Sequence, residues 1–467
     1  MNNKYSKIIA SVIFVFAAIL LFTGFKNRTN SAVCSNCNVI IVGYDTVAAK
    51  HVSSLGYDRE TTPNLDAIAE GGFSFANNIS PAPWTVPAFM SLFTDLYPTE
   101  HKVINKFSVF NSEEKTISNL KKLSPNVETL AQVFKENGYI TGGFTGDAGV
   151  SAQFGDGIGF DVYTDDKTFG SIENSAKYAL DWLSKNKGKK FFMFLHGYDA
   201  HGQFKTPEKY QGAFTLKNYS GKLNGTNAEQ AALREEQLVK KINLTGDDVA
   251  FLNGIYDSKI KDGDARFGEF WTEMKKLGLD KNTVVVILAD HGEEFYEHGG
   301  IDHGHTLYDE LVHVPLVFKV PGMPGGMKIT DQVTSLDVAP TLFDILGIKP
   351  DKTYQSQMRG VSLLPSMQGK EKISQDVFIE TDYRDFTHKR GIRTADGWKY
   401  ILTMQTNKAE LYDLKNDPSE LNNVAGDYPE IVSALDKRLK DHIVAMGDNP
   451  AKEWTIGCLP VYPEECK

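Results

Sequence analysis

A short apolar run that ends in metal-ligand side chains constrains the fold of this chain more than any other feature. Residues 283–289 read Thr-Val-Val-Val-Ile-Leu-Ala, which is typical of a strand buried on both faces of a parallel sheet. Asp290 and His291 follow at once, and such strands end at the crevice where α/β proteins bind ligands. A nitrogen with a carboxylate suits zinc or manganese, and a carboxylate-rich site suits calcium or magnesium. The alternative, an acidic turn with solvated histidines, fits the density of such side chains in 290–305 less well.

The rest of the chain alternates between strand and helix patterns. Buried strands are predicted at residues 38–43, 139–144, 190–195, 283–289 and 314–318. Helices are predicted at residues 62–70, 127–137, 175–185, 249–276 and 337–346. Alternation at this spacing predicts a doubly wound α/β sandwich around a mainly parallel sheet.

The pattern changes after about residue 370. Short strands at hairpin spacing are predicted at 377–381, 399–402 and 410–414, followed by a closing helix at 429–445. We therefore expect a catalytic domain over residues 38–370 and a small antiparallel subdomain over residues 371–467. The polar stretch 207–247 is predicted to be an excursion over the surface of the catalytic domain.

The N-terminus carries a segment that is not part of this fold. Ile8–Phe25 is mostly apolar, with lysines before it and Lys26 and Arg28 after it. Residues 1–30 therefore form a signal peptide or a membrane anchor. No clean Ala-x-Ala cleavage site follows, which favours an uncleaved anchor. In either case we expect the rest of the chain to be exported, either anchored to a membrane or secreted.

The four cysteines lie at the two ends of the chain, at positions 34, 37, 458 and 466. Cys34 and Cys37 could be redox-active, or could bind zinc together with Cys458 and Cys466. In an exported chain, oxidation to disulfides is the favoured state. Bridges to the C-terminal pair would hold the last segment beside the first strand, but the sequence leaves all three pairings open.

Two other polar residues occupy ends of predicted elements. Asp45 closes the first strand, and in a parallel sheet it can reach the same cation as Asp290. Thr85 follows a proline-rich loop and is predicted at the N-cap or in the first turn of a helix, where free N–H groups favour an anion. Each residue by itself is explained equally well, or better, as an ordinary cap.

Together these segments resemble the sulfatase family of the alkaline phosphatase superfamily. The resemblance runs from about Asn38 to the C-terminus. It includes Gly43-Tyr-Asp-Thr46, Thr62-Pro-Asn-Leu-Asp66, Phe192-Met-Phe-Leu-His-Gly-Tyr-Asp-Ala-His201, Tyr308-Asp-Glu-Leu-Val-His-Val-Pro-Leu316 and Glu410-Leu-Tyr-Asp-Leu-Lys-Asn-Asp-Pro418. It implies an alkaline-phosphatase-like α/β/α sandwich with a small C-terminal α+β subdomain.

The resemblance also implies roles for individual residues. The side chains of Asp45, Asp290 and His291 would hold one divalent metal ion (Zn, Mn, Ca or Mg), with Thr85 beside it at the nucleophile position. His201 and His303 fall where related enzymes bind the nonbridging oxygens of the ester or assist the leaving group. His305 is a neighbouring position that we expect to contact substrate. His196 and His298 are expected to be structural.

Two departures from the sulfatase pattern favour phosphate esters over sulfate esters as substrates. Sulfatases form formylglycine from the first residue of Cys/Ser-x-Pro-x-Arg, whereas this chain has Thr85-Val-Pro-Ala-Phe89. Oxidation of threonine would give a ketone, so no formylglycine is expected. Thr46 replaces the second acid of the usual Asp-Asp pair. A threonine nucleophile resembles the phosphoglycerol and phosphoethanolamine transferases, in which a metal-activated alkoxide attacks.

The sequence thus predicts an exported, metal-dependent hydrolase or transferase acting on phosphate monoesters or diesters, either of a small molecule or of a lipid or glycan. The first alternative is a sulfuric ester hydrolase that works without formylglycine. The second is a catalytically silent binding protein, which the presence of Thr85 and the metal ligands disfavours. The net charge of −10 argues against nucleic acid as a partner, and contact with a membrane is expected through the N-terminal segment.

Overall fold

The computed structural model describes residues 32–104, 110–111, 116–117, 122–202, 213–214, 216, 218–237, 240–383 and 387–452. The predicted signal peptide or anchor, Cys458 and Cys466 lie outside these residues. Within the described ranges, no helix is both long and apolar enough to cross a membrane. Cys34 and Cys37 form a disulfide with each other. The sequence left three disulfide pairings open, and the structure contains the one in which Cys34 pairs with Cys37. Cys37 therefore does not link the first strand to Cys458 or Cys466.

The described residues build an eight-stranded central sheet. Its strands are β1 (Asn38–Tyr44), β2 (Phe73–Ile79), β5 (Ile140–Phe144), β6 (Val162–Thr164), β7 (Phe191–Gly197), β8 (Thr283–Ala289), β11 (His313–Lys319) and β12 (Met327–Thr334). They lie side by side in the order β12-β2-β11-β8-β1-β7-β5-β6. The neighbouring pairs are parallel except where β11 meets β8 and β2. The prediction of a mainly parallel sheet is confirmed.

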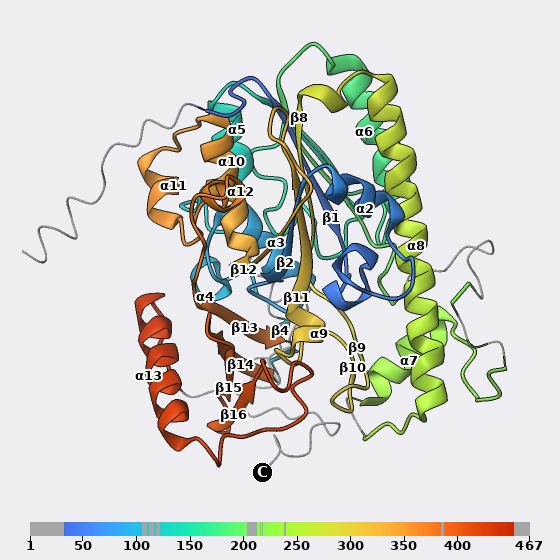
Figure 1. The fold of residues 1–467 in the computed structure, drawn as a ribbon, viewed down its shortest axis with the longest axis vertical. Helices are drawn as coiled ribbons and strands as arrows, with labels where there is room; N and C mark the ends of the chain where they lie inside the picture. The colour runs from blue at the N-terminus through green and yellow to red at the C-terminus, as the bar shows by residue number, and fades with distance from the viewer. Residues whose placement is uncertain are drawn as a thin grey trace, which may run out of the picture.

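Helices cover both faces of this sheet (Figure 1). One face carries α2 (Pro63–Glu70), α6 (Ile172–Asn186) and α8 (Gly246–Lys276), and the other carries α3 (Thr85–Thr94), α5 (Leu130–Glu136), α10 (Val338–Leu346), α11 (Lys352–Gln357) and α12 (Leu364–Met367). Successive side chains of a strand point to opposite faces, so Ile40 and Val42 pack in the first layer and Val39 and Ile41 in the second. Full burial on both faces explains the unbroken apolar runs.

Local signals explain where several helices begin and end, although α5 begins three residues after its predicted start. The hydroxyl of Thr129 accepts the Gln132 N–H at 3.3 Å and caps α5. Pro63 is the first residue of α2, where its missing N–H leaves no hydrogen bond unmade. Gly347, with φ of 70°, ends α10 in the left-handed region that glycine adopts without strain.

Three strands of the central sheet and several helices, α7, α11 and α12 among them, were not predicted. β6 is only three residues long and partly exposed. β2 contains Asn77 and Asn78, and β12 contains charged residues, so neither reads as an apolar run. The polar stretch 207–247 contains α7 (Asn227–Gln237), so that stretch is not irregular throughout. The amide of Gln237 anchors α7: its Nε2 donates to Ile301 O at 2.7 Å and its Oε1 accepts from Ile301 N at 3.0 Å.

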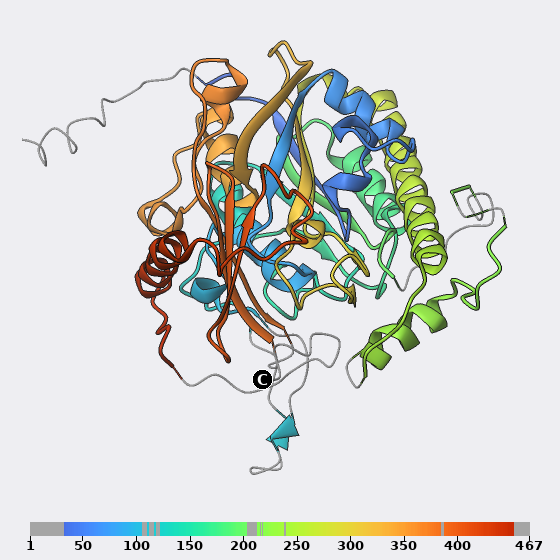
Figure 2. The same cartoon turned by 60° about the horizontal axis from the view of Figure 1, so that its bottom comes forward.

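A second sheet of four antiparallel strands follows in the chain. It consists of β13 (Val377–Tyr383), β14 (Thr387–Arg393), β15 (Trp398–Thr403) and β16 (Lys408–Asp413), and α13 (Pro429–Ala445) packs against it (Figure 2). β14 was not predicted because Lys389, Arg390 and Arg393 interrupt its apolar pattern, although all three side chains are buried.

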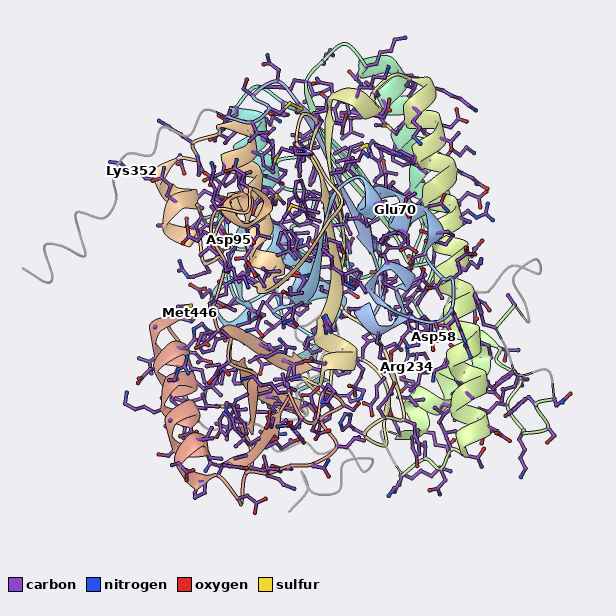
Figure 3. The ribbon with its side chains drawn as sticks, in the orientation of Figure 1. Asp58, Glu70, Asp95, Arg234, Lys352 and Met446 are labelled. Atoms are coloured by element: carbon purple, nitrogen blue, oxygen red, sulfur yellow. A yellow bond between two sulfur atoms is a disulfide. The ribbon has the colours of Figure 1, made fainter. Side chains whose placement is uncertain are left out.

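The carboxyl ends of β1 and β8 point toward this second sheet and toward α7 (Figure 1). Short elements lie between them: β9 (Glu294–Phe295), β10 (Ile301–Asp302) and α9 (Asp309–Val312). Arg234 of α7, labelled in Figure 3, lies beside this segment, and its Nε is 3.4 Å from Asp302 Oδ2. Three segments that are far apart in the chain therefore surround this sheet edge: α7, the segment from β9 to α9, and the second sheet. The sequence places the candidate ligands at this edge.

Candidate active site

The parallel pairing of β1 and β8 brings two buried carboxylates together. Tyr44 pairs with Ala289, so Asp45 and Asp290 leave the sheet side by side. Thr46, with φ of 59°, turns between them: its N–H donates to Asp290 Oδ1 at 3.0 Å and its hydroxyl donates to Asp45 Oδ1. The residue that replaces the expected second acid therefore orients both carboxylates.

Asp45, Asp290 and His291 present donor atoms that lie within 4.8 Å of one another. The N–H at Nδ1 of His291 donates to Gly292 O at 2.8 Å, which leaves the lone pair on Nε2. Asp290 is buried, and its Oδ2 has no hydrogen-bond partner among the described residues. An orphaned carboxylate oxygen beside a second carboxylate and an imidazole nitrogen fits a divalent cation. These residues are the predicted metal ligands, and the structure brings them together.

The two carboxylates differ in their electrostatic environment. Burial raises the pKa of Asp290 well above its ordinary value, and the adjacent charge of Asp45 raises it further. Burial would raise the pKa of Asp45 as well, but His196, His201 and His291 hold it below its usual range. Without a cation, the pair therefore carries one negative charge more readily than two.

Thr85 is the first residue of α3, one position after the N-cap Trp84. Its Oγ1 lies 3.2 Å from Asp45 Oδ2 and 3.3 Å from His291 Nε2. Both neighbours are acceptors, so the Thr85 hydroxyl donates its proton toward the predicted metal ligands. The helix N-terminus adds a positive field at the same atom. The predicted position in the first turn is thus found, with the hydroxyl at the cluster.

His201 and His303 lie on the other side of the cluster. The ring centroid of His303 is 4.3 Å from that of His291 and 5.1 Å from that of His201. Nδ1 of His303 lies 3.1 Å from Glu293 Oε1 and 3.0 Å from Asp302 Oδ1. Burial opposes a charge on His303, but these two carboxylates raise its pKa above the ordinary value. His303 is therefore held as a proton donor beside the cluster.

Three further histidines, His305, His298 and His196, were expected to contact substrate in the first case and to be structural in the other two. His305 Nε2 lies 3.5 Å from Glu294 Oε2 and its Nδ1 3.1 Å from His303 O, so it adjoins the site from behind His303. His298 Nδ1 lies 2.6 Å from Glu310 Oε1 and its ring stacks on Tyr308. The structural role expected for His298 stays a prediction, because one of its ring nitrogens also lies within 4.8 Å of carboxylate oxygens of Glu294 and Glu310. His196, also expected to be structural, lies 3.7 Å from Asp45 Oδ2, beyond hydrogen-bond distance but close enough to act on its charge.

Three residues of the site carried no signal in the sequence. Lys259 of α8 is buried, and its Nζ donates to His201 O at 3.3 Å, Gly202 O at 3.0 Å and Gln230 Oε1 at 3.2 Å. Burial lowers the pKa of Lys259 to about 7, against the opposing charge of Glu293. Gly149 packs on the side chain of Thr85, and its N–H donates to the Tyr198 hydroxyl. Each acts through a contact with a residue far away in the sequence.

A cavity of about 40 Å³ adjoins His201 and Asp302, with Arg234, Leu233 and Phe295 in its wall. On this measure a water molecule needs roughly 10–15 Å³, so the cavity holds a few waters and no sugar ring.

The chain matches two family models: Sulfatase, over residues 37–348, and N-sulphoglucosamine sulphohydrolase, C-terminal, over residues 296–445. It is 24% identical over 450 residues to the Delta 4,5-hexuronate-2-O-sulfatase of Bacteroides thetaiotaomicron, covering 88% of this chain and 90% of that protein.

Two solved structures show the same fold. The phosphonate monoester hydrolase of Agrobacterium radiobacter superposes with a TM-score of 0.68 at 21% identity, over 88% of this chain and 96% of that one. A structure described as a complex with its substrate D-glucosamine-2-N,6-O-disulfate has a TM-score of 0.68 at 18% identity, over 90% of this chain and all (100%) of that one.

Proposed function

This chain belongs to the sulfatase family and is a hydrolase of that family, and we propose that it hydrolyses sulfate esters of sugars through an unmodified Thr85 nucleophile. One observation carries the proposal: Thr85 Oγ1 lies 3.2 Å from Asp45 and 3.3 Å from His291, at the N-terminus of α3. The substrate class draws on a relative named as a hexuronate sulfatase and on a related structure described with a sulfated glucosamine. It is the alternative that the sequence left open, and it replaces phosphate as our first choice.

Asp45, Asp290 and His291 would hold the divalent metal ion that members of this family use, with Thr85 Oγ1 beside it. When bound, the ion would lower the pKa of the Thr85 hydroxyl and offset the charge of the ester group. Thr46 keeps both carboxylates turned inward, and Gly292 O keeps the proton of His291 on Nδ1. These contacts preorganise the donor atoms before any substrate arrives.

The reaction then follows from the placement of the side chains. Thr85 first gives its hydroxyl proton to solvent water. Oγ1 then attacks sulfur, the bond from sulfur to the leaving oxygen breaks, and that oxygen takes a proton from His201 or His303. Water then attacks the sulfur of the threonine sulfate and returns one proton to that histidine. The bond from sulfur to Oγ1 breaks, hydrogen sulfate departs, and Thr85 remains as the alkoxide for the next turnover. Because Asp302 and Glu293 favour the charged form of His303, its imidazolium also stabilises the nonbridging oxygens.

Threonine differs from a hydrated formylglycine at one position. The hydrate carries two hydroxyls on Cβ, whereas Thr85 carries one hydroxyl and a methyl group. In the hydrate, the second hydroxyl would expel sulfate by elimination. Thr85 lacks this hydroxyl, so water must hydrolyse the threonine sulfate intermediate. We therefore expect turnover that needs no formylglycine-generating partner.

The same threonine favours a second candidate function, the hydrolysis or transfer of phosphate esters. A phosphothreonine passes to water or to an acceptor alcohol without any need for the second hydroxyl. The shared fold with a phosphonate monoester hydrolase agrees with this chemistry but does not choose it. Sulfate and phosphate substrates therefore have to be compared directly on one enzyme preparation.

The deciding experiment compares 4-nitrophenyl sulfate, 4-nitrophenyl phosphate, a phosphate diester with the same leaving group, and sulfated hexuronates and glucosamines. We expect kcat/KM to be highest for a sulfated sugar, with ³⁵S label trapped on Thr85 after rapid acid quench. Label from a ³²P ester and higher kcat/KM for phosphate would establish the second function instead. Turnover with no label on Thr85 in either case would disprove the covalent mechanism.

The location of the protein is part of the same proposal. The apolar segment Ile8–Phe25 lies outside the described residues, and we propose that it exports the catalytic domain, either as an anchor or as a signal. Protease accessibility of the domain on intact cells tests this. Protection of the whole domain until the cells are lysed would contradict export to the cell surface.

A further inference from the structure

We propose that Gly149 and Tyr198 form a clamp that fixes the side-chain rotamer of Thr85. They are positioning residues, and their assignment rests on the nucleophile role proposed for Thr85. The clamp consists of the Cα of Gly149, packed on the Thr85 side chain, and the Tyr198 hydroxyl, which holds Gly149 in place. It explains how this fold accepts a β-branched nucleophile.

Gly149 approaches Thr85 too closely for any side chain. A β-carbon at position 149 would lie 2.8 Å from both Cβ and Cγ2 of Thr85 and 3.0 Å from the Tyr198 hydroxyl. Nonbonded carbons pack at about 3.5–4.0 Å, so only hydrogen fits there. The φ of Gly149 is not among the positive values, so space alone, and not backbone strain, requires glycine.

Tyr198 anchors the turn that carries Gly149. The Gly149 N–H donates to the Tyr198 hydroxyl oxygen at 2.6 Å. The turn itself is tight: Val150 N donates to Asp147 O at 3.0 Å, and Asp147 and Ala148 have φ of 59° and 54°. Without the tyrosine oxygen, the Gly149 N–H would lose its acceptor in a buried position.

Tyr198 is itself held rigidly between site residues. It is fully buried, and its ring centroid lies 4.8 Å from that of His196 and 5.5 Å from that of His201. On its other side the backbone of Gly146 packs so closely that a β-carbon would lie 2.7 Å from Tyr198 Cδ2. The hydroxyl therefore offers a fixed point from which the turn is positioned against Thr85.

The consequence concerns the direction of the nucleophile. Thr85 has three staggered χ1 rotamers, and the observed one points Oγ1 at Asp45 and His291 with its methyl group beside Gly149. Rotation about χ1 would take Oγ1 away from Asp45 and His291, or the methyl group away from Gly149. A serine lacks the methyl group that the clamp holds, so Thr85→Ser should keep activity but lose about two- to threefold in kcat through rotamer averaging.

The test is a mutant cycle between Gly149→Ala and Thr85→Ser. Gly149→Ala should lower kcat at least tenfold with KM nearly unchanged, because the methyl group displaces Thr85 without touching the outer subsite. Adding Thr85→Ser should recover part of that loss, since the clash with Cγ2 is removed. Gly188→Ala, where no atom lies within 4 Å of the added carbon, serves as the matched control. Unchanged kcat in Gly149→Ala would overturn the clamp.

A second variant and a spectroscopic readout separate this inference from the proposed function. Tyr198→Phe keeps the ring and removes only the acceptor of Gly149. In methyl-labelled protein, the signal lost in Thr85→Ser identifies the Thr85 methyl, whose three-bond couplings report χ1. We expect a single rotamer in the wild type and averaging in Tyr198→Phe. An averaged wild type, or an unaffected Tyr198→Phe, refutes the clamp even if no ester is turned over, whereas failure of the ester screen alone refutes only the function.

Discussion

Two buried clusters of charge in this molecule are built in opposite ways. Below α9, Lys399 Nζ lies 2.8 Å from Asp309 Oδ1 and 2.8 Å from Glu420 Oε1, and Arg393 completes the cluster 3.1 Å from Asp309. Two cations thus face two carboxylates. At the strand ends, Asp45 and Asp290 face each other, and among the described residues neither is paired with a lysine or arginine.

The pKa values follow this difference. Burial opposes ionisation of Asp309, yet Arg393 and Lys399 hold its pKa below the usual range. Burial and the charge of Asp45 both raise the pKa of Asp290. A cluster that neutralises itself joins the C-terminal sheet to α9, whereas a cluster left with unbalanced negative charge is the proposed site of an added cation.

The largest effect is expected at the nucleophile. Thr85→Ala should reduce kcat at least about 10³-fold, because removal of a nucleophile commonly lowers the rate by several orders of magnitude. The free energy of unfolding should change by less than about 2 kcal/mol. Thr94→Ala, at the other end of the same helix, removes an equally buried hydroxyl that donates to Met90 O and is the matched control. Near wild-type turnover in Thr85→Ala would reduce Thr85 to a structural residue.

The next effect concerns the neutralised cluster. Lys399→Met leaves Asp309 and Glu420 buried with too little positive charge, and should lower the free energy of unfolding by about 3–5 kcal/mol. The exposed pair of Lys437 and Asp441 on α13 offers the control, because Lys437→Met should cause no measurable loss. Denaturant unfolding at fixed metal concentration measures both. A stable Lys399→Met variant would show that the cluster is not what joins the C-terminal sheet to α9.

A smaller effect of opposite sign is expected at the strand ends. In the metal-free protein, Asp290→Asn removes one of two adjacent buried carboxylates, so stability should rise by about 1–2 kcal/mol. The wild type should gain stability on addition of the divalent ion, and the variant should gain much less. Asp309→Asn should instead destabilise with or without metal. Equal metal binding by wild type and Asp290→Asn, measured by calorimetry, would remove Asp290 from the ligand set.

The smallest effect is expected in how the stability difference between Asp290→Asn and the metal-free wild type depends on pH. The folded pKa of Asp290 is raised, so its contribution to stability is complete below the unfolded value of about 3.9 and is lost as pH rises through the folded pKa. The stability advantage of Asp290→Asn in chelator should therefore grow as pH rises above about 4. Unfolding curves of both proteins between pH 4 and 8 measure it, because other groups cancel. A flat difference would mean that Asp290 ionises normally.

Much of the site was open to prediction from the chain alone. Asp45, Asp290 and His291 follow strands that are apolar on both faces, and Thr85 begins a helix after a proline-rich loop. Parallel pairing then requires the strand ends to meet at one edge. β2, β12 and β14 were missed because polar residues interrupt their apolar patterns, and some of these residues find buried partners that only the folded structure supplies, as Asn78 does with Ser335 at 3.4 Å. β6 was missed because it is only three residues long.

The sequence by itself determined a mainly parallel sheet, five of its eight strands, and the candidate ligand and nucleophile residues, because each depends on a pattern within a few neighbouring positions. Only the tertiary structure decided how those residues are oriented. Tyr256 OH donates to Thr46 O at 2.8 Å across more than two hundred residues, Lys259 holds the backbone at His201, and Gly149 packs on Thr85. Contacts of this kind depend on distances in space, and no local pattern of side chains encodes them.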